Sequence, residues 1–402
     1  MLSILYPNLV PEIEQANIGI FPIPIDNDEF VLIVKAPKEF ILTAKANGEI
    51  AVYVIPLILD NTKTIGLVTA FFDDEDEPLM ISTPLWNDEA SMDLLRLVTG
   101  RKLDIHFFDD HSRELLQYHA TIDINDVVVE RVNNARFLEF SYPRAWDSID
   151  QMSLKFCTRD SVDDQLAVKI TLEKAVYGED IFIQDARTNL HSYVGARGFS
   201  HTMLEREEPG QYQEEDIVRS LFTIFTQDQI YLNPLRTYDK EEVCDILVVT
   251  DKTVLLVQAK DSPNTERVLG QTLQRKRKNA LKALKKAVAQ TKGAIGYYDR
   301  IPEIFEFLIN KDLYSIPKIN RKLRSLIVVK ELFVDQSDVF SPLVLEIFEE
   351  KGNPCLPLDY LGLRDICIHC RNQDEFFDCY DKLTESALNK GIYPEFRFGP
   401  KE

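Results

Sequence analysis

The sequence has no long apolar segment. An uninterrupted hydrophobic run of about 18 residues, the length that a membrane-spanning helix needs, does not occur in its 402 residues. The first residues also lack the basic stretch followed by an apolar one that is typical of a secretory signal. We therefore expect a cytoplasmic protein without a membrane contact.

Cysteine is scarce and follows no disulfide rhythm, and in a chain of this length reduced thiols are the default expectation. One cluster has C-x₂-C spacing, with Cys367 and Cys370 on either side of His369. A structural zinc site normally needs a second such pair, which the sequence lacks, so zinc is not expected here. The six cysteines are Cys157, Cys244, Cys355, Cys367, Cys370 and Cys379.

Positive charge is also in deficit, and the net charge is −20. Residues 1–200 contain 33 acidic and 17 basic side chains, which gives −16, whereas residues 201–402 contain 33 and 29, which gives −4. Binding of a polyanion depends on the local field rather than on the total charge. The acidic total therefore does not exclude a nucleic-acid partner for the C-terminal half.

The chain is too long for one ordinary core, and its 45% hydrophobic and 28% charged residues are typical of a globular protein. We predict two domains, 1–200 and 201–402, joined by a charged linker at 201–212 that contains Pro-Gly. The N-terminal domain is predicted to be α+β. Its expected elements are strands at 30–34, 50–57, 64–71, 103–108 and near 119–132, with a helix at 89–97.

The first half contains one stretch that predicts a turn and one that is acidic. Residues 58–63 separate two apolar runs and predict a hairpin. Residues 73–78 are almost all acidic and are expected to form a solvated loop or, alternatively, a face that binds a partner.

The C-terminal half alternates helical and extended patterns, which predicts an α/β sandwich. The order is helix, two strands, long helix and strand. The expected helices are 213–226, about 266–292, 341–351 and 373–389, and the expected strands are 243–250, 253–260 and 324–330.

The two central strands of this domain are predicted to form a hairpin. If Asp251 and Lys252 form a two-residue turn, Asp245 faces Gln258 and Val243 faces Lys260. Side chains alternate along a strand, so these polar groups share one face of the sheet. Burying a carboxylate and an ammonium is costly, and a structural Asp–Lys ion pair is one reading of the pattern.

A second reading comes from a resemblance. Residues 241–249, with Asp245, followed by Val-Leu-Leu-Val-Gln258-Ala-Lys260 resemble the PD-(D/E)xK nucleases, and most closely the Mrr-like restriction endonucleases. The resemblance covers about residues 213–295. It implies a restriction-endonuclease-like fold in which Asp245, Gln258 and Lys260 are catalytic. It also implies a glutamate on the preceding helix, for which Glu215 fits best and Glu214 is second.

The sequence departs from the family pattern at two points, because no proline precedes Asp245 and an amide replaces the second acid. The residue types nevertheless suit phosphodiester hydrolysis. The resemblance implies Mg²⁺ or Mn²⁺ held by oxygen atoms of Asp245, Gln258 and Glu215. Lys260 would orient or deprotonate the attacking water, or stabilise the developing negative charge.

The predicted long helix is unusually basic. Eight basic residues occur between 275 and 292 with no acidic residue among them, which is unlike the mixed signs of an ordinary solvated helix. A solvated outer face and a phosphate-contacting surface are both consistent with this pattern. The residues predicted to contact nucleic acid are Arg275, Lys276, Arg277, Lys278, Lys282, Lys285 and Lys286.

The sequence thus predicts a metal-dependent DNA endonuclease of restriction or anti-phage type, with the N-terminal domain as a sensor, specificity or partner-binding module. A homodimer is plausible because one such site cuts one strand at a time. The alternative is a catalytically degenerate module that binds nucleic acid or a protein partner. RNA instead of DNA as the substrate stays open.

Overall fold

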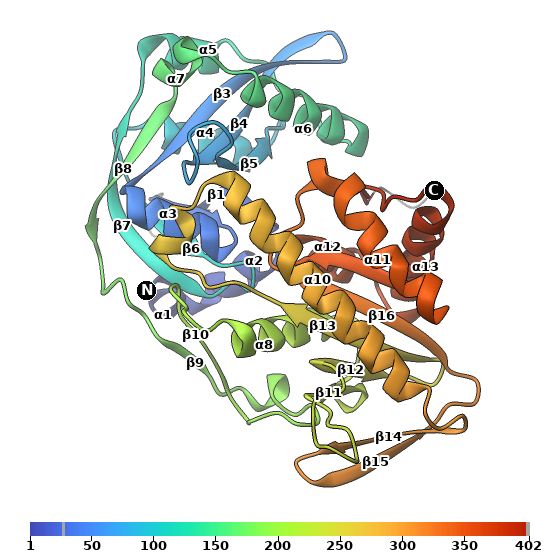
Figure 1. Cartoon of the computed structure of the whole chain (residues 1–402). Helices are drawn as coiled ribbons and strands as arrows, with labels where there is room; N and C mark the ends of the chain where they lie inside the picture. The colour runs from blue at the N-terminus through green and yellow to red at the C-terminus, as the bar shows by residue number, and fades with distance from the viewer. Residues whose placement is uncertain (26–28, 399–402) are drawn as a thin grey trace.

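The computed structural model describes residues 1–25 and 29–398 and shows a mixed α/β protein built on two sheets (Figure 1). Each sheet has its own hydrophobic core. One core runs from Ile20 to Leu204 and includes Leu269, and the other runs from Tyr193 to Tyr393. The chain therefore passes from one core to the other near residue 200. No helix in the described ranges combines the length and apolar composition that crossing a bilayer requires.

The N-terminal sheet has eight strands in the order β1-β2-β6-β7-β8-β3-β4-β5. Its edge strands β1 and β5 contact one another, so the sheet curls strongly around its core. The strands are β1 (Gly19–Pro24), β2 (Phe30–Lys35), β3 (Glu49–Leu59), β4 (Thr62–Phe71), β5 (Leu79–Pro84), β6 (Lys102–Phe108), β7 (Glu114–Asp123) and β8 (Val168–Ala175).

The predicted hairpin is confirmed, since β3 pairs with β4 in antiparallel register out to Leu59 and Thr62. Between them Asp60 and Asn61 have φ of 47° and 62°. Two consecutive positive φ values are the signature of a type I′ turn, which Asp and Asn tolerate better than most residues.

Helices cover this sheet, and one of them replaces a predicted strand. Strand β7 ends at Asp123, and residues 126–133 form helix α5 instead of continuing the strand expected near 119–132. Asn125 caps this helix by accepting a hydrogen bond from the Val127 amide at 2.9 Å. The helices are α1 (Leu2–Leu5), α2 (Val10–Gln15), α3 (Lys38–Asn47), α4 (Glu89–Val98), α5 (Asp126–Asn133), α6 (Tyr142–Cys157) and α7 (Ser161–Gln165).

The C-terminal sheet has five strands in the order β11-β12-β13-β16-β17. The first three are antiparallel neighbours, and β16 and β17 continue the sheet in parallel with β13. The predicted strands 253–260 and 324–330 are present as β13 and β16. The bounds are β11 (Ile230–Leu232), β12 (Ile246–Val249), β13 (Thr253–Lys260), β16 (Lys322–Val329) and β17 (Cys355–Asp359).

Helices flank this sheet, with α10 crossing β13 and β16 on the side that faces the viewer (Figure 1). The single helix expected over 266–292 is in fact two, because the chain turns at Gly270 and Thr272 caps a new helix. The helices are α8 (Gly210–Leu221), α9 (Glu266–Leu269), α10 (Leu273–Tyr298), α11 (Ser337–Lys351), α12 (Tyr360–His369) and α13 (Gln373–Lys390).

Two small hairpins complete the fold. Strands β14 (Ile304–Ile309) and β15 (Asp312–Pro317) pair after α10, and β9 (Ile183–Asp185) pairs with β10 (Ser200–Thr202). Strand β10 lies at the start of the segment expected to be a charged linker.

This segment is packed rather than solvated. The backbones of Arg206 and Asn264 exchange hydrogen bonds of 2.8 and 2.9 Å, and Arg206 is 6% exposed. Asp216 and Asp261 flank the buried guanidinium of Arg206, each at 3.9 Å, and their negative charges stabilise it there.

Candidate functional site

The central hairpin has the predicted register. Ile246 pairs with Val257, and the ladder continues through Val249 and Val254. The ladder does not extend to the predicted pairs Asp245–Gln258 and Val243–Lys260, and Val243 instead donates its backbone N–H to the Pro234 carbonyl at 2.7 Å. The ladder therefore ends where the polar residues begin.

Three predicted site residues meet at this end of the hairpin. The Oδ2 atom of Asp245 accepts hydrogen bonds from the Gln258 side-chain amide, from the Ala259 backbone N–H at 2.6 Å and from Lys260 Nζ at 3.4 Å. Asp245 is 5% exposed and Gln258 3%, so the carboxylate is held inside the protein by three donors. Such focusing on one oxygen fixes the position of the carboxylate.

The surroundings of Asp245 disfavour the charged form of its carboxylate. Burial raises its pKa, and the ammonium of Lys260, the Ala259 N–H and the Gln258 amide only partly oppose this rise. A bound cation would stabilise the charged form of this carboxylate further.

Helix α8 supplies the next acid, and the residue that it brings to Asp245 is Glu214. The pKa of Glu214 is raised to about 7 by burial and by the charge of Asp245, while the Asn233 amide and Lys260 oppose the rise. Asn233 Nδ2 donates to Glu214 Oε2 at 3.2 Å. Glu214, the second choice from the sequence, is thus the helix acid that shares the field of Asp245 and Lys260.

Glu215, the first choice, lies elsewhere on the helix. Its Oε1 accepts a hydrogen bond from Gln211 Nε2 at 3.0 Å, and burial raises its pKa, with the Gln211 hydrogen bond and the charge of His201 opposing the rise. Adjacent residues on a helix point about 100° apart, so both glutamates cannot face the same strand. The Glu-x-x-apolar-x-x-x-apolar spacing through Ile217 to Leu221 would have selected Glu214.

A further acid was missed by the sequence reasoning. Glu242 lies just before the hairpin, and its pKa is raised by partial burial and by the charge of Asp245, with Lys260 opposing. The acidic pair Glu241–Glu242 preceding the strand was the available signal. The charge of Asp245 thus raises the pKa values of both Glu214 and Glu242, and Lys260 opposes the rise in the pKa of all three acids.

The donor set suits a hard cation in chemistry, since carboxylate and amide oxygens are ligands of Mg²⁺ and Mn²⁺. Asp245, Glu214 and Gln258 could supply them. In the described ranges no group of three His, Cys, Asp or Glu side chains is arranged to hold a metal ion. The amide of Gln258 presents nitrogen to Asp245, and turning it by about 180° would present oxygen without moving the backbone.

The cysteine cluster at 367–370 is part of the core. Cys367 is 2% exposed, and burial raises its pKa. His369 stacks on Phe398 with ring centroids 4.5 Å apart, and its Nδ1 lies 2.9 Å from the Asp365 carbonyl oxygen.

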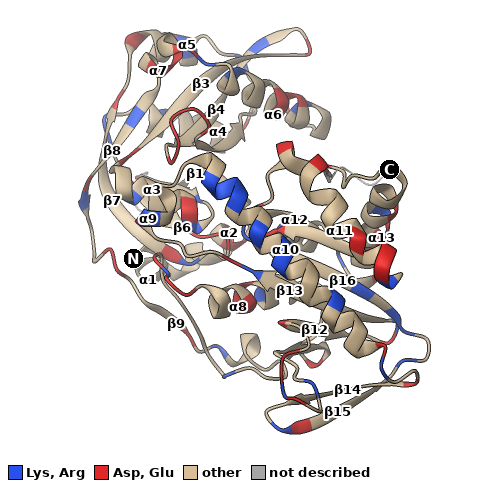
Figure 2. Cartoon of the chain, viewed as in Figure 1, with Lys and Arg blue, Asp and Glu red and all other residues tan. Residues whose placement is uncertain are grey.

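The basic residues of helix α10 are concentrated in its N-terminal half (Figure 2). Its opposite face is buried, through Leu284, Ala287 and Val288. Five of the seven residues predicted to contact nucleic acid are exposed and form no ion pair within the residues described. This exposed basic row consists of Arg275, Lys278, Lys282, Lys285 and Lys286.

The other two are engaged by acids. Lys276 pairs with Asp73, and Arg277 pairs with Glu77 at 3.0 Å and with Asp335 at 2.7 Å. Asp73 and Glu77 belong to the acidic loop at 73–78, which connects β4 to β5 and is drawn beside the start of α10 in Figure 2. The loop expected to be solvated therefore neutralises one end of the basic helix.

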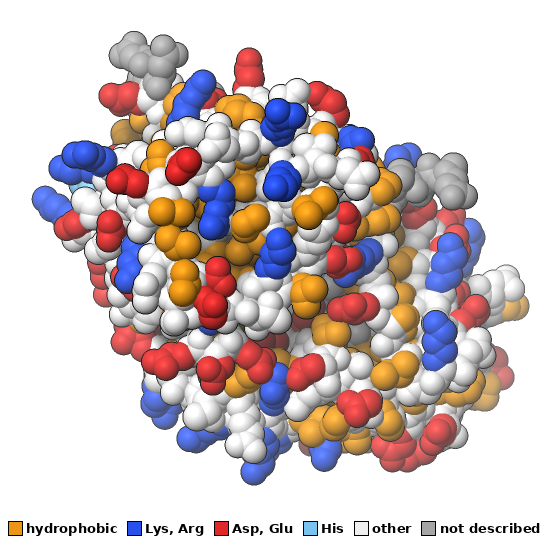
Figure 3. Space-filling view, turned by 90° about the horizontal axis from the view of Figure 1, so that it is seen from above, with side chains coloured by type: hydrophobic (Ala, Val, Ile, Leu, Met, Phe, Trp, Pro, Cys, Tyr) orange, Lys and Arg blue, Asp and Glu red, His pale blue; other side chains and the backbone are white. Residues whose placement is uncertain are grey.

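The face of the molecule drawn in Figure 3 carries mixed charge. Seen from above in Figure 3, acidic and basic side chains lie next to one another with apolar groups between them. The single-signed row on α10 is a contrast to that face.

The N-terminal sheet is fastened to helix α8 by buried ion pairs. Asp216 accepts from Arg113 at 2.8 Å and from Lys38 at 3.3 Å, and both cations also contact Asp109. The pKa values of Asp109 and Asp216 lie below the usual range, with Arg113 the largest cause opposing burial. Because Asp216 follows Glu214 by two residues, this network also fixes the helix that carries the site acid.

Comparisons of the chain with family models, with curated proteins and with solved structures find no match.

Proposed function

We propose that this protein is a metal-dependent DNA endonuclease, of the type used in restriction or phage defence. The observation that carries the proposal is the convergence of Gln258 and Lys260 on the buried carboxylate of Asp245, whose charge also raises the pKa of Glu214 on α8. The arrangement of helix α8, antiparallel strands, long helix α10 and parallel strand β16 supports a restriction-endonuclease-like fold.

The residues divide the chemistry between them. Asp245, Gln258 and Glu214 would hold Mg²⁺ or Mn²⁺, which when bound polarises the phosphate and lowers the pKa of water. Lys260, anchored on Ala259 O at 2.6 Å and within 3.4 Å of Asp245, places a positive charge where the phosphorane gains negative charge. The same ammonium can position the attacking water by hydrogen bonding.

The basic row on α10 would hold the sugar–phosphate backbone. Its five exposed cations lie on one helix of the domain that contains Lys260, and phosphate contacts of this kind position a duplex without reading its sequence. Cleavage of both strands would need a second copy of the site, so a homodimer is part of the proposal. The site of action would be the cytoplasm, and the curled N-terminal sheet would recognise the target or a protein partner.

A non-catalytic module that binds nucleic acid or a partner is the second candidate. The observation that favours it is the closed contact of the Gln258 amide with Asp245, which already satisfies the carboxylate without a cation. The two functions differ in their need for metal.

A thermal-shift titration with Mn²⁺ separates them. Under the nuclease proposal, saturating Mn²⁺ raises the melting temperature by roughly 3–5 °C, because a ligand that binds only the folded state stabilises it. The rise is expected to disappear in Asp245→Asn, which keeps the shape of the side chain and its acceptor for the Ala259 N–H. An equal rise in both proteins would place the metal elsewhere.

The two helix glutamates give a matched pair of variants. Glu214→Gln is expected to weaken Mn²⁺ binding at least about tenfold, since it removes a charge from the field of Asp245. Glu215→Gln, one residue away and bonded to Gln211, is expected to leave the affinity unchanged. The measurement is calorimetric titration, and the reverse order of effects would return the role to Glu215.

The acidic loop should compete with DNA. Replacing Asp73 by Asn and Glu77 by Gln frees Lys276 and leaves Arg277 paired with Asp335 alone, so the double variant should bind duplex DNA more tightly, with a salt dependence steeper by about 0.9 in log–log slope. Glu75→Gln with Asp76→Asn removes the same charge from the same loop without breaking an ion pair of the described residues. Equal affinities for the two double variants would exclude direct competition.

A further inference from the structure

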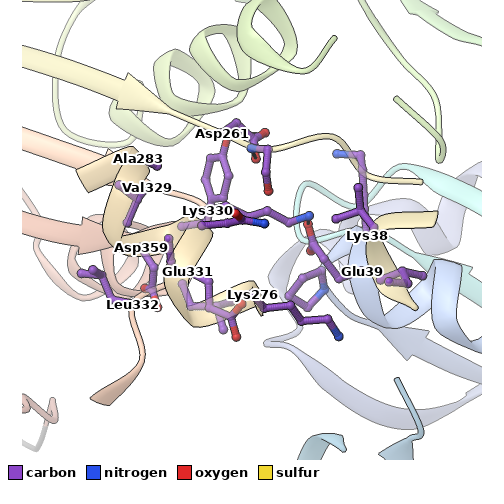
Figure 4. A pocket seen from close by; sticks show the side chains of 18 of the residues that line it. Lys38, Glu39, Asp261, Lys276, Ala283, Val329, Lys330, Glu331, Leu332 and Asp359 are labelled. Atoms are coloured by element: carbon purple, nitrogen blue, oxygen red, sulfur yellow. Dashed lines mark hydrogen bonds and ion pairs between the residues drawn. The ribbon is translucent and has the colours of Figure 1, made fainter. Parts of the chain in front are cut away.

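A cavity of about 280 Å³ lies between the two sheets, next to the proposed phosphodiesterase site (Figure 4). Its floor is the carboxyl end of the parallel strands, through Lys260, Val329 and Asp359. Helix α3 closes it from the N-terminal part with Lys38 and Glu39. Open α/β sheets bind their ligands at this end of the strands, and Lys260 belongs both to the cavity wall and to the cluster around Asp245.

One wall carries a cation with unused donors. Arg206 lines the cavity with its side chain 5% exposed, and its Nε and Nη1 atoms have no hydrogen-bond partner among the residues described. Its nearest carboxylates, Asp216 and Asp261, lie at 3.9 Å, beyond hydrogen-bond distance. A buried guanidinium with unmet donors is costly unless a ligand or water accepts from it.

A carboxylate, that of Asp261, also lines the cavity close to Arg206. Asp261 has a side chain that is 2% exposed, and it accepts hydrogen bonds from the Ser262 backbone N–H at 2.7 Å and from the Tyr360 hydroxyl at 3.5 Å. The cavity thus offers a guanidinium donor and a carboxylate acceptor close together. Part of the remaining wall is apolar, with Ala283 and Val329 labelled in Figure 4 and the ring of Phe40 contributed by α3, and charged side chains such as Lys276 and Glu331 line the rest.

These features favour a flat, neutral, polar ring over a phosphate. The cations of the cavity are already opposed by acids, since Lys330 contacts Glu39 at 2.9 Å and Arg206 lies between two aspartates. A second phosphate would meet these carboxylates, whereas a nucleobase has donors and acceptors on its edge and apolar faces. The volume is near the lower end of small-ligand pockets, which suits one base.

We propose that this cavity binds a single nucleobase, held by Arg206 and Asp261. The base can belong to a free nucleoside, or to a nucleotide unstacked from a DNA strand whose phosphate lies at Lys260. The second source rests on the proposed nuclease function, and the first does not. In either case the cavity is a recognition site that couples the N-terminal part to the hairpin.

The first experiment uses free nucleosides. Guanosine, adenosine, cytidine and thymidine are titrated into the full chain by calorimetry, with ribose 5-phosphate as a ligand that has no base. At least one nucleoside is expected to bind, and ribose 5-phosphate is not. Ala283→Phe fills the cavity and should weaken binding at least tenfold, whereas Ala289→Phe on the exposed face of the same helix should not.

The second experiment uses DNA in EDTA, so that no cleavage occurs. A duplex with 2-aminopurine at successive positions should gain fluorescence at one position on binding to the wild type and to Ala289→Phe, but not to Ala283→Phe. Arg206→Lys, which keeps the charge and loses the forked donors, should lower nucleoside affinity roughly ten- to hundredfold.

The outcomes are separable. Nucleoside binding without a fluorescence gain assigns the cavity to a free ligand, and a fluorescence gain assigns it to DNA. Neither signal in the wild type, or signals that Ala283→Phe leaves intact, would overturn the proposal. If the wild-type protein binds a nucleoside but shows no metal-dependent cleavage of DNA, the nuclease proposal is overturned and the proposal of a nucleobase site stands.

Discussion

Replacing Lys260 by alanine is expected to lower Mg²⁺- or Mn²⁺-dependent cleavage of duplex DNA by at least about 10²–10³-fold. The ammonium lies 3.4 Å from the Asp245 carboxylate and is partly buried, so its charge acts in a medium of low polarity and is poorly replaced by solvent. The measurement is the single-turnover rate of conversion of supercoiled plasmid to nicked and linear forms.

The matched control is Lys252→Ala. Lys252 lies in the turn of the same hairpin, is exposed, and pairs only at the surface with Asp374 at 3.1 Å. The control should cleave at the wild-type rate, and Asp245→Asn should fall with Lys260→Ala. Undiminished cleavage by both site variants would remove Asp245 and Lys260 from the chemistry.

Neutralising the exposed basic row is expected to cost most of the affinity for DNA. Each phosphate contact contributes about 0.9 to the slope of log K against log salt, so changing all five residues to glutamine should reduce the slope by up to about 4.5. The helix should persist, because glutamine is a good helix former and the buried face of α10 is unchanged. Fluorescence anisotropy between about 50 and 200 mM salt measures the slope.

Five exposed lysines elsewhere serve as the control, because their replacement changes the net charge by the same amount. If binding depended only on total charge, both variants would lose affinity equally, and the helix would lose its assigned role. The control residues are Lys102, Lys169, Lys174, Lys351 and Lys390.

The sequence predicted the parts of the fold in which local pattern and burial agree. Strand β13 occupies the predicted residues 253–260 because seven of its eight side chains are buried and the turn at 251–252 sets its register. The type I′ turn at Asp60 and Asn61 is equally local. Helix α5 was missed because the decisive feature, the Asn125 cap, outweighed the β-branched valines that follow it.

The site was predictable where one hairpin builds it and not where distant segments meet. Asp245, Gln258 and Lys260 follow from a two-residue turn and alternation along strands. The choice between Glu214 and Glu215 depends on the rotation of α8, which is held by Lys38 of α3 and by Arg113 in the turn between β6 and β7.

The cavity could not be predicted from the sequence for the same reason, because segments distant in the chain form its walls. Lys38 and Asp216 are 178 residues apart in the chain, and no periodicity in the sequence links them. The acidic loop was likewise read as solvated, because the sequence carries no sign that its partner is the basic helix 200 residues later.

The position of bound Mn²⁺ tests the central claim most directly. Crystals grown with Mn²⁺ should show an anomalous peak about 2.0–2.5 Å from a carboxylate oxygen of Asp245, with Glu214 and the Gln258 amide oxygen turned toward it. A peak at that place would agree with a metal-dependent phosphodiesterase site at the end of the hairpin. A fully occupied peak elsewhere, with the Gln258 amide still closed on Asp245, would contradict it.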